Sequence, residues 1–164
     1  MLSPIVTIMS HFEILFKIDV EGVAFVAEDV AEVPLVDKTT QTLVPRAAEI
    51  FSEWYDLYKD PETNLMDAQC ISNFISGATK QPCSKDDKRV ETIVNTYDSD
   101  KDGNINLQDF LRFYYVAASG SNPKAVQSNL KNHNVRLDLK KMSEVVDEVS
   151  YAQHEMPRYT LSAN

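Results

Sequence analysis

The chain has 164 residues and a mass of 18.5 kDa, which fits one domain or one domain with an extension. Its formal net charge of −9 comes from 25 acidic and 16 basic side chains. This balance disfavours a nucleic-acid partner, because phosphate binding depends on clustered Lys and Arg, and it suits metal cations or basic partners. With 43% hydrophobic and 25% charged residues, the composition excludes wholesale disorder.

Cysteine usage and the N-terminal stretch indicate the compartment. Cys70 and Cys83 are the two cysteines, too few for a disulfide framework. The N-terminus lacks the basic start of a signal peptide. His11 and Glu13 interrupt its apolar run well before the roughly 20 residues that cross a membrane. We therefore expect a cytoplasmic chain without a membrane span.

Residues 1–45 are expected to form an N-terminal segment made of a β hairpin and a linker. Apolar and polar residues alternate over residues 12–20, and a period of two favours a half-buried strand. A second short run at residues 23–27 would complete the hairpin. A helix over residues 25–36 is the alternative. The stretch 34–42, which contains proline and several threonines, is interpreted as a connector.

From residue 46 the apolar residues recur at helical spacing, which predicts four helices before residue 118. The first helix should stop at the Asp60–Pro61 pair, because proline cannot continue a helix. The other three are expected at residues 67–78, 85–97 and 107–118.

The last part of the chain, residues 119–164, should add further helices and a polar tail. A break is expected at residues 119–121. Asn122 can then cap a short helix that has Pro123 at its first position, where a missing N–H costs nothing. His133 would lie at the end of that helix. A last amphipathic helix is marked by Met142, Val145, Val146 and Val149.

The clearest chemical pattern lies at residues 98–109, where three aspartates at alternate positions precede a glycine. Calcium takes six to eight oxygen ligands, more than adjacent side chains on a helix can supply, and a loop of this kind lets the ligands converge. Gly103 permits the positive φ that bends the chain back. The expected ligands are Asp98, Asp100, Asp102, the backbone carbonyl of Asn104, Asn106 through a water, and Asp109.

Apolar residues at helical spacing flank this loop on both sides, and the whole pattern resembles the EF-hand calcium-binding family. An isolated Asp-rich stretch could equally be a solvated turn, so the flanks decide the interpretation. The resemblance implies a mainly α fold containing an EF-hand pair, with Ca²⁺ as the ligand. The family usually has Glu at the twelfth loop position. Asp109 is one methylene shorter, which should weaken calcium binding and favour tolerance of Mg²⁺.

The same apolar pattern occurs once more, earlier in the chain, but there its ligands are lost. When residues 59–70 are aligned with residues 98–109, Asn64 takes the place of Gly103. Asn is the commonest residue other than glycine at positive φ. Lys59 stands at the first ligand position, Pro61 at the third and Cys70 at the twelfth. A cation and a thiol at these positions should abolish calcium binding, so this hand is expected to be degenerate.

The two hands are expected to share one core. The degenerate hand would cover residues 46–78 and the calcium-binding hand residues 85–118. A lone hand exposes an apolar face, so such motifs pair through their loops. Met66 opposite Ile105 would form that bridge, and Trp54 would belong to the shared core.

No catalytic constellation is expected in this chain. Cys70 together with a histidine could suggest a thiol protease dyad, but no nucleophile signature surrounds the cysteine. The sequence is also similar, more weakly, to the EF-hand-bearing segment inside very large ubiquitin-specific proteases. The residues that carry this second resemblance are 98–115, 129–130, 136–139 and 156–159.

Two classes of function therefore remain open. The first is a calcium-binding module with a regulatory or structural role. The second is a non-catalytic interaction scaffold with a protein partner, in which the metal is incidental or Mg²⁺. The resemblance to the ubiquitin-specific proteases implies a scaffold or regulatory segment of a larger deubiquitinating enzyme.

Overall fold

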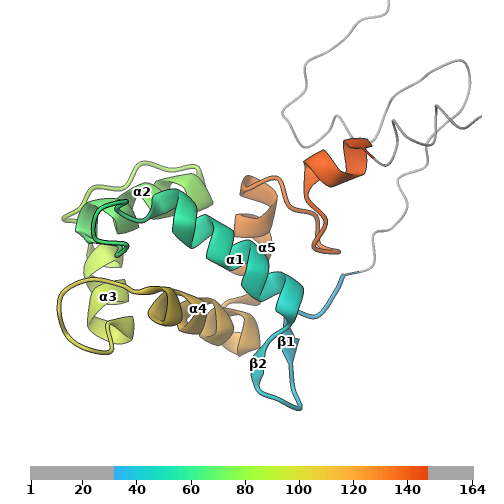
Figure 1. Cartoon of the computed structure of the whole chain (residues 1–164), viewed down its shortest axis with the longest axis horizontal. Coiled ribbons are helices and arrows are strands. Elements are labelled where there is room, and N and C mark those ends of the chain that lie inside the picture. The colour runs from blue at the N-terminus through green and yellow to red at the C-terminus, as the bar shows by residue number, and fades with distance from the viewer. Residues whose placement is uncertain (1–31, 148–164) are drawn as a thin grey trace, which may run out of the picture.

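The computed structural model describes residues 32–147, which form a mainly helical fold with one two-stranded sheet (Figure 1). The helices are α1 (Pro45–Tyr58), α2 (Ala68–Thr79), α3 (Lys88–Tyr97), α4 (Leu107–Val116), the π-helical turn η2 (Ala117–Ser121) and α5 (Pro123–Asn132). A further helix begins at residue 142 and reaches residue 147. The strands expected over residues 12–20 and 23–27 lie outside the described residues, as does the tail from residue 148. Within residues 32–147, every helix is too short or too polar to cross a membrane.

The sheet is a small hairpin directly before α1, where we expected a connector. β1 (Val36–Asp37) pairs antiparallel with β2 (Thr42–Leu43), and Val36 lies opposite Leu43. The turn is closed by the Asp37 carboxylate, which accepts a hydrogen bond of 2.7 Å from the backbone N–H of Thr39. The connector prediction for residues 34–42 is therefore wrong, because an aspartate side chain that bonds the backbone two residues on stabilises a turn. The alternative helix is also wrong at its end, where Val36 is a strand residue.

Capping side chains set the helix starts. Asp67 accepts a hydrogen bond from the backbone N–H of Cys70 at 2.8 Å and caps α2, which therefore begins at Ala68, one residue later than expected. α3 begins at Lys88 rather than residue 85. The reason is Asp87, whose carboxylate accepts from the backbone N–H of Arg89 at 2.9 Å and caps the helix there. Asn122 caps α5 as predicted, with Pro123 in the first turn.

The helix bounds repeat along the chain at the spacing seen in the sequence. α1 ends at Tyr58 and α3 at Tyr97, whereas α2 begins at Ala68 and α4 at Leu107. The offset between the two helix ends equals the offset between the two helix starts, so the two inter-helix loops occupy equivalent positions. We call residues 59–70 the ligand-poor loop and residues 98–109 the aspartate loop.

A β-bridge joins these two loops. The N–H of Met66 donates to the carbonyl of Ile105 at 3.0 Å, and the N–H of Ile105 donates to the carbonyl of Met66 at 3.0 Å. Both loops place a left-handed residue at the same relative position, Asn64 (φ 57°) and Gly103 (φ 86°), and the aspartate loop has a second one at Lys101 (φ 60°). The predicted bridge and the predicted positive φ values are confirmed.

An aromatic core fills the space between the helices. Phe51 of α1 stacks on Tyr114 of α4 with 4.0 Å between ring centroids, and Phe74 of α2 meets Phe110 edge to face. α1 therefore lies against α4, as Figure 1 shows. Trp54 is 5% exposed, so its expected place in the core is confirmed.

Residues beyond 118 join the same core. Val126 and Leu130 of α5, and Val135 and Leu139 after it, are buried with the aromatic residues. His133 follows α5 and stacks on Trp54, with 4.1 Å between ring centroids. α5 and the residues that follow it up to Leu139 are therefore packed onto the two helix–loop–helix units as part of one hydrophobic core.

Candidate metal centre

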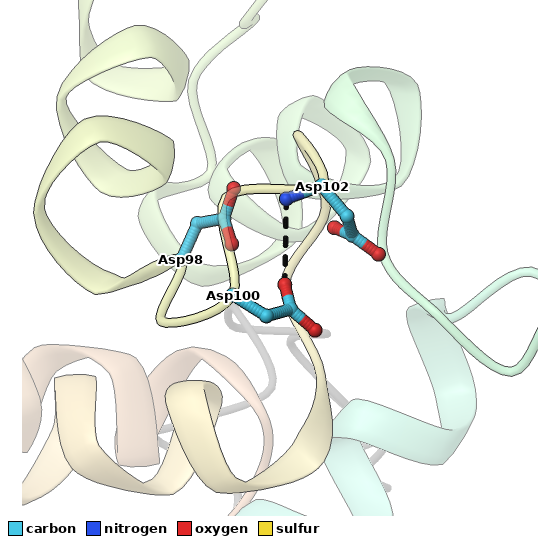
Figure 2. A group of neighbouring side chains, drawn as sticks. All are labelled: Asp98, Asp100 and Asp102. Carbon is cyan, nitrogen blue, oxygen red and sulfur yellow. Dashed lines mark hydrogen bonds between the residues drawn. The ribbon is translucent and has the colours of Figure 1, made fainter.

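Three carboxylates converge in the aspartate loop between α3 and α4. Oxygens of Asp98, Asp100 and Asp102 all lie within 4.8 Å of one another (Figure 2). Asp98 is half-buried and the other two are exposed. Three negative charges at this separation repel one another, and a bound cation relieves such repulsion. Among residues 32–147, this is the one group of at least three potential ligand side chains that meets this distance.

Backbone N–H groups of the loop hold these carboxylates in place. The carboxylate of Asp98 accepts from Lys101 N–H at 2.7 Å and from Gly103 N–H at 2.8 Å. Asp100 accepts from Asp102 N–H at 3.4 Å, the bond that is dashed in Figure 2. The loop therefore folds around its own acidic side chains.

Gly103 is required for its backbone angle rather than for space. Its φ of 86° lies in the left-handed region, which residues with a Cβ rarely adopt. A Cβ built at this position would meet nothing within 4 Å. The glycine predicted at the sixth loop position thus has the conformational role that the sequence indicated.

Asp98 and Asp100 differ in their affinity for protons. Desolvation alone would raise the pKa of Asp98, but hydrogen bonds, led by those from the N–H groups of Gly103 and Lys101, outweigh it and lower this pKa. The N–H of Asp102 lowers the pKa of Asp100, yet desolvation and the neighbouring carboxylates outweigh that bond and raise it. Of these two side chains, Asp98 is consequently the one whose ionised form the loop stabilises. The ionised form of Asp100 is destabilised by desolvation and by the neighbouring carboxylates.

Asp109 lies in the first turn of α4 and is 2% exposed. Its Oδ2 atom is buried and has no hydrogen-bond partner. Asp109 does not belong to the group formed by the other three aspartates, so the structure brings together three of the four predicted acidic ligands. A buried carboxylate oxygen without a hydrogen-bond partner destabilises the folded state. A cation bound near the N-terminus of α4 would give this oxygen a partner. This orphaned oxygen fits a metal site.

The two asparagines of the loop make local hydrogen bonds. Asn104 donates its backbone N–H to the carboxylate of Asp102 at 2.8 Å. Asn106 uses its side-chain oxygen to accept the backbone N–H of Asp109 at 3.0 Å, and it thereby caps α4. The sequence predicted Asn106 as a ligand through water, and its capping bond was not foreseen. The spacing of an Asn three residues before an Asp at a helix start is the signal that could have indicated it.

The ligand-poor loop satisfies its polar groups without a cation. The ammonium group of Lys59 pairs with the carboxylate of Asp56 at 2.8 Å, outside the loop. Asp60 accepts the backbone N–H groups of Glu62 and Thr63 at 2.7 and 2.9 Å. The bonds from Thr63 and Glu62 lower the pKa of Asp60. Sequence reasoning assigned no role to the Asp60 side chain, although an Asp–Pro pair is a known turn signal.

The twelfth position of the ligand-poor loop carries a thiol. Cys70 is a half-buried free cysteine, and desolvation raises its pKa, which keeps the thiol protonated. A neutral thiol is a poor ligand for calcium, which prefers oxygen. Cys83 is also a half-buried free cysteine.

Comparisons of the chain with protein-family models, with curated proteins and with solved structures found no match.

Proposed function

We propose that this chain is a divalent-cation-binding module whose aspartate loop binds one calcium ion in the manner of an EF-hand. The observation that carries the proposal is the combination of three convergent carboxylates with the buried, unpartnered oxygen of Asp109. Surface acidic clusters are common without a metal. A buried acceptor without a donor is uncommon, because its desolvation is uncompensated, and Asp109 occupies the loop position where the sequence pattern places the last ligand.

The ligands would come from one loop and the helix that follows it. Asp98, Asp100 and Asp102 would supply side-chain oxygens from the loop, and Asp109 would complete the shell from α4. The backbone carbonyl of Asn104 and a water held by Asn106 would add two more oxygens. A bound cation would neutralise the repulsion among the carboxylates. Because Asp109 reaches less far than glutamate, we expect a dissociation constant on the order of 10⁻⁵ to 10⁻³ M.

We further propose that the two helix–loop–helix units form an EF-hand pair with one degenerate member. The regular repeat of the helix bounds supports this, as does the bridge between Met66 and Ile105. In this arrangement the ligand-poor loop is a permanent partner that stabilises the aspartate loop. The module would then be regulatory or structural, with a single ion.

A calcium titration tests the proposal. Trp54 is buried at the junction of α1 and the C-terminal residues, so its fluorescence reports a rearrangement of the core. We expect a saturable change with a midpoint on the order of 10⁻⁵ to 10⁻³ M. The change should be lost in Asp98→Ala and retained in Asp86→Ala, which removes an exposed aspartate outside both loops. Calorimetry without any heat of binding, for both Ca²⁺ and Mg²⁺ at about 10 mM, would refute the proposal.

The alternative is a non-catalytic interaction scaffold, in which the metal is Mg²⁺ or incidental. The observation in its favour is an open groove between α1 and the helix that begins at residue 142. Leu57 and Val146 line this groove and are 68% and 55% exposed. Such a scaffold would suit a segment of a larger ubiquitin-specific protease. Ion binding by calorimetry with no change in Trp54 fluorescence would favour this alternative over a calcium-responsive module.

A further inference from the structure

The hydroxyl of Tyr55 contacts both loops at once. Tyr55 lies in α1 and is 3% exposed. Its hydroxyl donates to the carbonyl oxygen of Asn64 at 2.6 Å and lies 3.3 Å from the carbonyl oxygen of Ile105. Asn64 belongs to the ligand-poor loop, whereas Ile105 belongs to the aspartate loop. One buried donor therefore links the backbones of the two loops.

This link lies where the aspartate loop turns toward its last ligands. Ile105 stands between Asn104 and Asn106, and its backbone already pairs in both directions with Met66. The Tyr55 hydroxyl adds a third polar contact at the same point. Asn64 is the left-handed residue of its loop, so the same hydroxyl also holds the carbonyl of a backbone turn. The contact thus restrains both loops near the bridge.

The aspartate-loop hand cannot supply an equivalent contact. The repeat that aligns Tyr58 with Tyr97 places Tyr55 opposite Val94, and valine has no side-chain donor. At this helix position, the side-chain link between the loops therefore comes from the degenerate hand, in addition to the backbone bridge to which both loops contribute. Burial, followed by the negative charges of Asp56 and Asp109, raises the pKa of Tyr55 to about 12. The hydroxyl stays protonated near neutral pH.

We propose that Tyr55 is a positioning residue for the aspartate loop, through which the degenerate hand increases the metal affinity of its partner. The inference rests on the proposed function. A loop held in its binding conformation before the ion arrives loses less conformational freedom on binding, so its affinity is higher. The degenerate hand, which has lost its own ligands, would retain this role.

Tyr55→Phe isolates the hydroxyl from the ring. The ring packs against Phe110 with 5.7 Å between centroids, and phenylalanine preserves that packing. Tyr58→Phe is the matched control, because it removes a hydroxyl from the same helix. The Tyr58 hydroxyl lies 3.2 Å from Nε2 of His133, a residue outside both loops. Both variants are made in the full chain, and thermal melts establish the temperature at which both are folded.

Two measurements are compared at that temperature. Calorimetry with Ca²⁺ should show a dissociation constant raised about three- to tenfold in Tyr55→Phe, the range for loss of one buried hydrogen bond. Hydrogen exchange of the Met66 and Ile105 amides, measured without metal, should be faster in Tyr55→Phe than in the wild type. In Tyr58→Phe both quantities should stay within about twofold of the wild type.

The outcomes separate this inference from the proposed function. If the wild type binds calcium and Tyr55→Phe binds equally well, the positioning role is refuted while the metal site stands. Equal weakening in Tyr55→Phe and Tyr58→Phe would show a general effect on stability and would also refute it. A wild type that binds no divalent cation removes the proposed function, and this inference falls with it.

Discussion

The two loops of this protein have similar backbones and opposite polar chemistry. Both follow a helix that ends at a tyrosine, both place a left-handed residue at the sixth loop position, and both precede a helix capped by an Asp or Asn side chain. In the ligand-poor loop, Lys59 pairs with a neighbouring carboxylate and Asp60 accepts two backbone N–H groups. In the aspartate loop, three carboxylates crowd together and Asp109 keeps a buried oxygen without a partner.

This difference shows how one loop conformation can be stabilised in two ways. In the ligand-poor loop, the side chains of Lys59, Asp60 and Thr63 make local polar contacts. The aspartate loop concentrates carboxylates that repel one another, so binding of a cation should stabilise the folded state. Experiments that add a cation, or remove a charge, should therefore affect the two loops unequally.

The largest expected effect is stabilisation of the whole fold by calcium. At a free calcium concentration about 100 times the dissociation constant, binding should add about 2.7 kcal/mol to the free energy of unfolding. For a fold of this size the melting temperature should rise by roughly 5–10 °C. A chelator such as EDTA should reverse the shift, which differential scanning calorimetry can follow. A shift of the same size in Asp98→Ala would place the ion elsewhere.

Two substitutions of Asp109 test its role. Asp109→Asn should weaken metal binding and stabilise the metal-free protein, whereas Asp109→Glu should tighten metal binding. Asp109→Asn removes the buried unpaired charge, so the metal-free protein should gain about 1–2 kcal/mol in urea unfolding. The same variant should bind calcium more weakly. Asp109→Glu extends the carboxylate by one methylene and should tighten calcium binding by about tenfold, or ~1.4 kcal/mol. Unchanged affinity in Asp109→Glu would contradict a ligand role for this residue.

The left-handed residues provide the next comparison. Gly103→Ala should cost about 1–2 kcal/mol, because alanine is strained at a φ of 86° although its Cβ meets no atom. Gly103→Asn should cost less, since Asn tolerates this region and serves the equivalent position as Asn64. Chemical denaturation measures both costs. Equal losses for the two variants would show that the glycine has a role other than its φ.

The two capping residues should contribute similar stability without metal. Asp67→Ala and Asn106→Ala each remove a side-chain acceptor from a helix N-terminus, at a cost of about 1 kcal/mol. With calcium at saturation the loss in Asn106→Ala should grow, because this residue also lies in the aspartate loop. Urea titrations with and without calcium give both numbers. A calcium-dependent loss in Asp67→Ala instead would assign the ion to the other loop.

The smallest expected effect is a difference in response to acid. The pKa of Asp60 is lowered in the folded protein, so its ionised form contributes stability above the unfolded pKa near 3.8. That contribution disappears as the pH falls through the lower folded pKa. The pKa of Asp100 is raised, so its ionised form costs stability, and this cost fades as the pH falls through the raised value. NMR titration of the carboxyl carbons in metal-free protein should therefore show Asp100 protonating before Asp60.

Much of the aspartate loop could be predicted from sequence because its chemistry is local. Alternating carboxylates and a glycine indicate the turn, and the tertiary structure places Asp98, Asp100 and Asp102 together. The bridge between Met66 and Ile105 followed from the repeat of the apolar pattern. The hairpin before α1 was missed because its strands are very short and its turn depends on one side chain, Asp37.

Contacts between distant residues could not be read from the pattern. Nothing in the spacing of Tyr55 indicates that its hydroxyl reaches Asn64 and Ile105, which are 9 and 50 residues further along the chain. The packing of α5 against α2, and of His133 onto Trp54, was equally invisible, because it depends on how the π-helical turn η2 directs the chain. In η2, Gly120 takes a φ of 148° and breaks the helical path.

Local patterns in the chain were sufficient to predict the helices of residues 45–116, the two equivalent loops and which loop carries the cluster of carboxylates. These properties depend on residue types at short, regular spacing, and backbone sterics and capping act over the same range. The folded arrangement was needed to find that Asp109 is buried with an unpartnered oxygen and that Tyr55 links the loops. Burial and contacts across many residues arise when separate helices pack, and no local pattern encodes that packing.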